Sequence, residues 1–409
     1  MSSLFVSPST HSVAAFVESV LADIRQAPPS ALAELLNVPH TEVRQDPSAT
    51  TALSGLGTAA ARMFFPDLAR PRVDPTALIT LPDDDSELFC PGPVRDDPAL
   101  GELVNEQLVA WAGEMGIYPD RLDHLRRCGF GRMIMLAHPG CDDPDRLLAA
   151  TKVMVAEWAS DDYYLDESEV GADPATTAAK FGLLYGVVDP VALPARYTSA
   201  EQRYLQEEPI ARAFRDSMEH LAQYTTTAQM ARFQHQMAIL FTTLDQNASW
   251  RHSGARPKAW EYLSHRQHNS YLPPMILCDV LSGYELSPQE FYFPPVRRAV
   301  LMIGLAAVLI NDIHSAAKEH DDDISLPEAI SEEENCSLEQ AVRETVAVHN
   351  ELMKAFVAEA TVLSAAGSPA LRRFFTDLWA WCGGSREWHA TTLRYRSEQS
   401  SDREPAPAV

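Results

Sequence analysis

The chain has 409 residues, of which 46% are hydrophobic and 22% charged, and its formal net charge is −24. Such a negative field disfavours nucleic acid and anionic membrane surfaces, because both attract clusters of lysine and arginine. No stretch approaches the roughly 18 to 20 apolar residues of a membrane-spanning helix, and the N-terminus shows no secretion signal. The cysteines are scattered without a Cys-x-x-Cys pair, as is typical of reduced thiols. We therefore expect a cytoplasmic protein with no nucleic-acid partner and no stable membrane association.

The chain is expected to contain one folded domain between two irregular ends. Residues 1–90 contain many prolines and are predicted to be a partly disordered extension. Over 91–398 apolar residues recur at i, i+3, i+4 and i+7, whereas alternating strand patterns are nearly absent. Residues 399–409 are predicted to be a disordered tail. The fold class is therefore all-α, a single helical-bundle domain over 91–398.

An acidic cluster lies at the end of an apolar helix predicted over 147–164. Asp161, Asp162 and Asp166 lie near the end of this helix, where its dipole already disfavours negative charge. A divalent cation would compensate, since Mg²⁺ prefers oxygen ligands such as carboxylates. At about 100° per residue, Asp162 and Asp166 share one helical face. The alternative is a solvated acidic helix end that binds nothing.

A second polar cluster follows the apolar helix predicted over 299–310. Asn311, Ser315 and Glu319 lie at i, i+4 and i+8, on one helical face. Their amide, hydroxyl and carboxylate oxygens form a ligand set that suits Mg²⁺. Asn and Ser are poor residues for a helix interior, which favours a function over an incidental spacing. Lys318, next to Glu319, could contact a phosphate.

Together the two clusters resemble the aspartate-rich and Asn-Ser-Glu motifs of bacterial class I terpene synthases. The pattern Asn-Asp-x-x-Ser-x-x-Lys-Glu is present in full from Asn311, and the resemblance covers about residues 88–396. It implies a class I terpenoid synthase fold around a deep active-site cavity, with three Mg²⁺ ions that bind and ionise a prenyl diphosphate. It also implies that Asp161 is the first ligand and that Asp162 pairs with an arginine. The helical geometry instead groups Asp162 with Asp166, and both interpretations stay open.

Further residues are assigned by the same resemblance. Arg266, in the segment over 262–269, would sense the diphosphate, with Asn269 as a linker and Ser270 as the residue whose carbonyl faces the ionising carbon. The usual family residues at these last two positions differ. Arg394 and Tyr395 resemble the C-terminal Arg-Tyr pair that contacts the diphosphate. Aromatic candidates to face a carbocation, with ordinary core packing as the alternative, are Trp158, Tyr164, Phe241, Trp250, Trp381 and Trp388.

The segments 90–98, 262–270 and 379–388 resemble the family branch that forms 2-methylisoborneol and 2-methylenebornane. This implies cyclisation of 2-methylgeranyl diphosphate, a C11 substrate supplied by a geranyl diphosphate C-methyltransferase. The chain departs from that branch at Leu165, Asp166 and Glu167. A cyclase of geranyl or farnesyl diphosphate and a non-catalytic helical binding protein remain as alternatives, as does a trans-prenyltransferase, which would need a second aspartate-rich motif. Assembly as a homodimer is left open.

Overall fold

The structure is a computed structural model that describes residues 88–166, 172–190, 192–316 and 324–394. The predicted extension up to residue 87, the predicted tail, and Lys318, Glu319 and Tyr395 lie outside these ranges. The domain limits at 90 and 398 therefore stay a prediction. Within the described ranges the secondary structure is helical without a strand, which confirms the all-α class. No described helix is long and apolar enough to cross a membrane.

The described helices differ widely in length, from single turns to more than seven turns. In chain order they are α4 (Pro98–Met115), α5 (Leu122–Cys128), α6 (Phe130–Ala137), α7 (Pro144–Asp161), η2 (Asp162–Asp166), α8 (Thr177–Val188), α9 (Ala195–Glu207), α10 (Pro209–Leu221), α11 (Thr227–Ser253), α12 (Ala259–Arg266), α13 (Leu272–Met275), α14 (Cys278–Leu281), α15 (Pro288–Phe291), α16 (Pro294–Ser315), α17 (Leu326–Glu334), α18 (Leu338–Ala366) and α19 (Pro369–Thr391).

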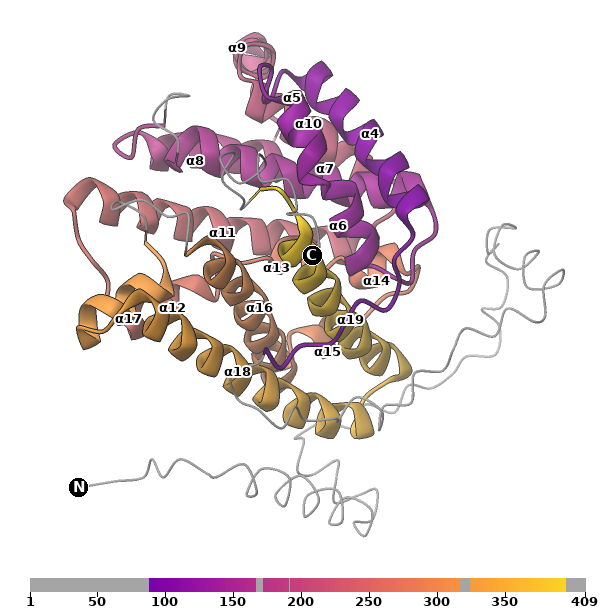
Figure 1. The fold of residues 1–409 in the computed structure, drawn as a ribbon. Coiled ribbons are helices and arrows are strands. Elements are labelled where there is room, and N and C mark those ends of the chain that lie inside the picture. Colours follow the sequence, from indigo (N-terminus) through magenta and orange to yellow (C-terminus); the bar gives the residue numbers. More distant parts are fainter. Residues whose placement is uncertain (1–87, 167–171, 191, 317–323, 395–409) are drawn as a thin grey trace, which may run out of the picture. The chain divides into compact units, whose positions relative to one another are not determined.

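The helices pack as two connected groups. In the first, α7 lies against α4, α6 and α10, and in the second, α16 lies against α18 and α19. Helix α19 also packs on α6, so it joins the groups. Figure 1 shows this arrangement, with yellow α19 beside both α6 and α16. Because α7 and α16 are held by neighbours along their length, each presents the polar residues at its C-terminal end at a fixed place.

Helix α7 begins at Pro144, and the side chain of Asp143 caps it by accepting hydrogen bonds from the amides of Asp145 and Arg146. The predicted α-helix up to residue 164 is wrong at its end. The α-helix stops at Asp161, and Asp162–Asp166 form a π-helical turn. In this turn Asp162 and Tyr163 both contact Tyr118, whereas Tyr164 packs against Phe181. Single π-helical turns are frequent at functional sites.

Most of the apolar run predicted from Ala299 to Ile310 is buried in α16, and Leu301 and Met302 within it are half-buried. Gly304 on this helix faces Leu272 of α13. A Cβ atom at Gly304 would lie 2.6 Å from Cδ2 of Leu272, which is closer than such atoms pack. The absence of a side chain therefore lets α13, and the segment between α12 and α13, approach α16 closely.

Candidate active site

The end of α7 is fixed by contacts on two sides of the helix. On one side Lys152 Nζ lies 2.9 Å from Asp216 Oδ1 of α10 and 5.4 Å from the ring centre of Trp111 in α4. On another side the Trp158 ring packs edge-on against Phe130 of α6, with centroids 4.5 Å apart. Asp161 and Asp162 follow within one turn of Trp158, so their backbone positions are set by these packed side chains.

Asp162 is buried and engaged on both of its oxygens. Tyr118 Oη donates a hydrogen bond of 2.5 Å to Asp162 Oδ2, and Arg394 Nη2 lies 3.6 Å from Oδ1. Of the two interpretations of the acidic cluster, this geometry matches the one that pairs Asp162 with an arginine. That arginine is Arg394, the first member of the predicted Arg-Tyr pair. The side chain of Asp166 lies outside the described part of the structure.

Arg394 is also positioned by aromatic rings. Its guanidinium carbon lies 4.8 Å from the ring centre of Trp158 and 6.0 Å from that of Phe130. A guanidinium over an indole face is attracted by the negative charge of the ring. The Trp158 ring and the Asp162 carboxylate, four residues apart in the chain, therefore both position the guanidinium of Arg394.

The second polar cluster centres on Arg266, at the end of α12. Arg266 Nη2 donates to Asn311 Oδ1 at 3.0 Å and to Asp312 Oδ1 at 2.6 Å. Arg266 Nη1 donates to the carbonyl oxygen of Asn269 at 3.2 Å. The structure thus brings three predicted residues together, Arg266, Asn269 and Asn311. The side chain of Ser270, which follows, is buried and donates to the carbonyl oxygen of Gln267.

Asp312 is a residue that the sequence analysis missed as an anchor of this cluster. It is 1% exposed, and its Oδ2 accepts a 2.9 Å hydrogen bond from Tyr262 Oη. Burial by itself lowers the pKa of Arg266, but the charge and the hydrogen bond of Asp312 outweigh burial and raise it. The signal was present in the sequence, because Asp312 directly follows Asn311 in the motif.

Ser315 completes the described part of the second cluster. It lies in the last turn of α16, and its Oγ donates to the carbonyl oxygen of Asp312 at 3.4 Å. The described oxygens of the two clusters are carboxylate, amide and hydroxyl groups, which are hard donors that suit Mg²⁺. No group of three or more His, Cys, Asp or Glu side chains placed to hold a metal occurs in the described ranges. The donor chemistry therefore fits a magnesium site whose ligands come from separate helices.

A chain of ring contacts links the two clusters. The Tyr271 ring, next to Ser270, lies 6.2 Å from Trp158 of α7, and Tyr271 Oη is 3.1 Å from His389 Nε2 of α19. The His389 ring in turn stacks on His314 of α16, with centroids 5.9 Å apart. The segment between α12 and α13 is thereby packed against α7 and α19.

The predicted aromatic candidates fall into separate groups. Trp158 and Trp388 lie 5.7 Å apart at the end of α7. Phe181 separates Tyr164 from Phe241, since its ring stacks on Phe241 and meets Tyr164 edge-on. Trp381 is linked to this first pair through Tyr271, whose ring lies against both Trp158 and Trp381, and Trp250 packs against His265. Trp158 of the first pair lies against Arg394, the arginine that contacts Asp162.

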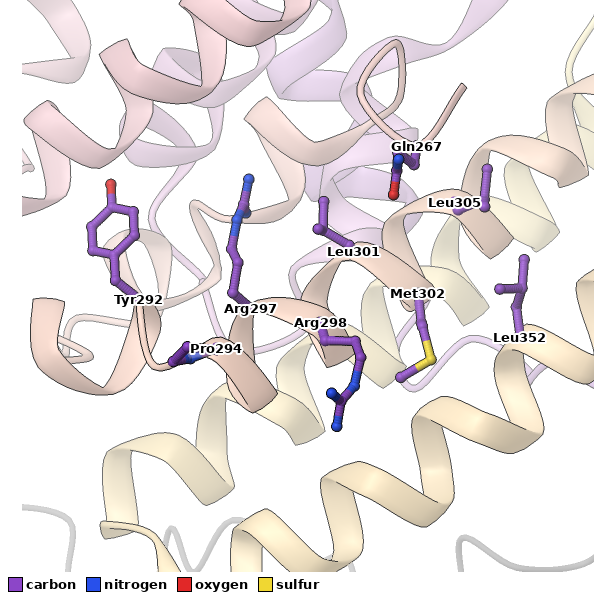
Figure 2. A pocket seen from close by; sticks show the side chains of 9 residues that line it. All are labelled: Gln267, Tyr292, Pro294, Arg297, Arg298, Leu301, Met302, Leu305 and Leu352. Carbon is purple, nitrogen blue, oxygen red and sulfur yellow. The ribbon is translucent and has the colours of Figure 1, made fainter. Parts of the chain in front are cut away.

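A cavity of about 420 Å³ opens on another flank of α16 and is shown in Figure 2. Apolar side chains and two arginines line it. None of the predicted site residues is among them, although Gln267 adjoins Arg266. Its lining residues are Gln267, Tyr292, Pro294, Arg297, Arg298, Leu301, Met302, Leu305 and Leu352.

An all-helical fold with an aspartate pair at the end of one helix and an Asn-Asp-x-x-Ser sequence near the end of another defines a class I terpene cyclase. The model of terpene synthase family 2, C-terminal metal binding, matches residues 152–355, which include Asp161, Arg266 and Asn311. The chain belongs to this terpene synthase family, and the resemblance to bacterial class I terpene synthases is confirmed.

Several relatives are 2-methylisoborneol synthases. That of Saccharopolyspora erythraea is 34% identical over 317 residues, covering 76% of this chain and 89% of the relative. The (+)-T-muurolol synthase of Streptomyces clavuligerus, which cyclises (2E,6E)-farnesyl diphosphate, is 29% identical, with 76% and 73% covered.

A solved structure is similar over an equal share of the chain. The crystal structure of 2-methylisoborneol synthase from Streptomyces coelicolor A3(2), in complex with Mg²⁺ and 2-fluoroneryl diphosphate, superimposes with a TM-score of 0.72. The two proteins are 31% identical, and the match covers 76% of this chain and 97% of that one. The predicted terpenoid synthase fold is therefore confirmed.

Proposed function

We propose that this cyclase acts on 2-methylgeranyl diphosphate and converts it to a bornane-type product such as 2-methylisoborneol or 2-methylenebornane, with release of diphosphate. The observation that carries this proposal is the difference in identity between groups of relatives. Over stretches of nearly equal length, the chain is 34% identical to a 2-methylisoborneol synthase and 29% identical to a muurolol synthase. The C11 substrate would come from methylation of geranyl diphosphate by a separate C-methyltransferase.

We further propose that Mg²⁺, as three ions, is held between the two polar clusters. Asp161, with Asp166, would supply carboxylate oxygens from the end of α7, and Asn311, Ser315 and Glu319 would supply oxygens from the second cluster. When bound, the ions neutralise charge that develops on the leaving diphosphate. Support comes from the all-oxygen donor set and from the Mg²⁺ in the crystal structure of the relative from Streptomyces coelicolor.

Asn311 can serve both the arginine and a metal ion. Its Oδ1 accepts a hydrogen bond from Arg266, and an amide oxygen has two lone pairs, so the same atom can also bind a cation. In this arrangement Arg266 orients the Asn311 side chain, and the second N–H of its Nη1 would donate to the diphosphate. Both oxygens of Asp312 already accept hydrogen bonds, from Arg266 and Tyr262, which fits a positioning residue.

Arg394 would serve the same leaving group from the other side. It lies between Asp162 and Trp158, and a diphosphate is a stronger partner than a carboxylate at 3.6 Å. We propose that Arg394 turns toward the diphosphate when substrate binds, together with Lys318 and Tyr395. Asp162 then keeps its hydrogen bond from Tyr118. Asp162 would accordingly position Arg394, and Asp161 would be the ligand nearer to the metal.

The decisive experiment is incubation of the full chain with Mg²⁺ and, separately, geranyl, 2-methylgeranyl and farnesyl diphosphates, followed by analysis of volatile products. We expect the C11 substrate to give the highest kcat/KM and a bornane-type product. A chelator such as EDTA serves as the control and should stop turnover. Preference for farnesyl diphosphate would overturn the C11 proposal in favour of a sesquiterpene cyclase, the alternative that the muurolol synthase relative supports.

A further inference from the structure

Glu157 on α7 is a buried acid whose side chain has no hydrogen-bond or ion-pair partner among the described residues. Its exposed fraction is 6%, and its Oε1 is buried without a hydrogen bond from any described residue. Leaving a buried polar group unsatisfied lowers the stability of the fold, and lowers it further when the group is charged. A glutamine or leucine would fill the position without an ionisable group. The cost therefore points to a use for the carboxyl group outside folding.

The direction in which Glu157 faces follows from the contacts of its helix. At about 100° per residue, Glu157 lies about 140° from Lys152, which faces α4 and α10, and about 100° from Trp158, which faces α6. It lies only about 40° from Asp161, one turn further along. Glu157 therefore turns away from α4, α6 and α10 and shares the face of the proposed metal ligand.

The same face of α7 meets α14 near the beginning of the helix. Arg146 Nη1 donates to the carbonyl oxygen of Val280 at 3.4 Å, and Arg146 lies within about 20° of Glu157 around the helix. Helix α13 also packs on α7. Glu157 thus lies on the side of α7 that faces α13 and α14. The segment that carries Asn269 and Ser270 directly precedes α13, so this side of α7 is turned toward it.

The surroundings make Glu157 a strong proton acceptor when it is ionised. Burial raises its pKa well above the usual range, and no described charge or hydrogen bond opposes this effect. A carboxylate of higher pKa is a stronger base. A carbocation formed next to Asp161 would supply the positive charge that the surroundings of Glu157 lack. The attraction between this cation and the Glu157 carboxylate would be large, because the two charges are close together in an apolar interior.

We propose that Glu157 accepts the proton that ends the cyclisation, a step that rests on the proposed function. When the product is an alkene, the C–H bond next to the cationic carbon breaks. Its electron pair becomes the new C=C bond, and the proton bonds to a carboxylate oxygen of Glu157. When the product is an alcohol, a water oxygen bonds to the cationic carbon and the proton that this water loses passes to the same carboxylate. Either way Glu157 ends as a carboxylic acid, the form that its buried surroundings favour, and this proton must pass to water after product leaves and before the next turnover.

The test compares Glu157→Gln with the wild type on whichever of the three prenyl diphosphates the wild type converts. Diphosphate release and volatile products are measured in the same reaction. Glutamine keeps the shape but accepts no proton, so we expect diphosphate release within about 3-fold of wild type and at least about a 10-fold fall in the main product per diphosphate released. Other alkenes or alcohols should take its place, and which class increases shows whether the proton comes from carbon or from water.

Glu351→Gln, at an exposed position of α18, is the matched control and should change neither measurement. If Glu157→Gln does not fold by circular dichroism, Glu157→Asp replaces it, with the same shift expected because the shorter acid is displaced. An unchanged product profile at an unchanged rate overturns the inference and leaves the proposed function intact. Loss of diphosphate release in a folded variant also overturns it, because the residue would then act in ionisation. A wild type that converts none of the diphosphates overturns both proposals.

Discussion

Arg266 and Asp312 form an almost buried ion pair, with Nη2 of the arginine 2.6 Å from Oδ1 of the aspartate. The same nitrogen donates to Asn311 Oδ1, so one guanidinium ties the end of α12 to the polar end of α16. The carboxylate next to the proposed ligand Asn311 is thereby used to hold an arginine. This relationship explains how an aspartate in the second cluster can matter without binding metal.

Asp312→Asn should strongly destabilise the protein and slow catalysis. The substitution removes the charge opposite Arg266, whose side chain is 15% exposed, and leaves a nearly buried cation without its counter-ion. We expect the free energy of unfolding to fall by about 3 kcal/mol and kcat to fall with it, because Arg266 and Asn311 lose their orientation. Urea unfolding and steady-state kinetics measure the two effects.

The control for Asp312→Asn is Glu359→Gln, which removes the partner of Arg298 in an exposed pair. The Arg298 side chain is 65% exposed, and exposed pairs contribute about 0 to 1 kcal/mol. Equal losses of stability in the two variants would show that the Arg266–Asp312 pair contributes no more to the free energy of unfolding than the Arg298–Glu359 pair.

Asn311→Ala should abolish turnover without unfolding the protein. The substitution removes an amide oxygen that the proposed metal site needs, whereas α16 gains a residue of higher helix propensity. We expect kcat/KM to fall at least about 100-fold and the Mg²⁺ concentration for half-maximal activity to rise. Glu334→Ala, at the exposed end of α17, is the control. Full activity of a folded Asn311→Ala variant would remove Asn311 from the proposed ligand set.

Much of this arrangement was predictable from the sequence because its signals are local. Apolar periodicity placed α7 and α16, and polar residues after each apolar run marked Asp161 and Asn311. The Arg266–Asp312 pair joins residues 46 positions apart, so no local pattern shows it. A charged residue and its distant partner become neighbours only when the helices pack.

Local sequence patterns could not predict the details of the acidic cluster either, because these details depend on how distant residues pack. A regular helix was predicted through residue 164, but a π-helical turn begins at Asp162. Tyr118, which donates to Asp162, lies in a loop and has a φ angle of 51°, in the left-handed region. The resemblance indicated an arginine partner for Asp162, and packing determined that it is Arg394.

The protein should lose stability as the pH falls from neutral to about 4. Burial lowers the pKa of His138, His265 and His389 to about 3 and that of His349 to about 4. These values lie below the roughly 6.5 of an unfolded histidine, so the unfolded chain binds more protons in this window. Stability is therefore complete above pH 6.5 and declines below it, by at most about 1.4 kcal/mol per histidine and pH unit.

Asp377 and Glu157 act in the opposite sense, because burial raises the pKa of Asp377 to about 6 and that of Glu157 well above its usual range. Two such carboxyl groups do not reverse the sum of the four buried histidines. Urea unfolding at pH 7.5, 6.5 and 5.5 measures the slope. His138→Gln should flatten it, and His252→Gln, at an exposed position, should leave it unchanged. A free energy of unfolding that rises between pH 6.5 and 5.5 would contradict the prediction.

Tyr118→Phe should impair catalysis more than it impairs folding. The substitution keeps the ring, which meets Tyr163 edge-on at 5.6 Å, and removes only the hydroxyl that donates to Asp162 Oδ2. Without that donor the carboxylate is free to follow Arg394, so Arg394 is released less readily to the diphosphate. We expect kcat to fall about 10-fold, with a loss of stability near 1 kcal/mol, the usual contribution of one hydrogen bond. Tyr224→Phe removes a similar tyrosine–aspartate hydrogen bond, to Asp145 at an exposed site, and should leave kcat unchanged. Equal kinetics in both variants would show that the hydroxyl of Tyr118 has no part in positioning Asp162 and Arg394.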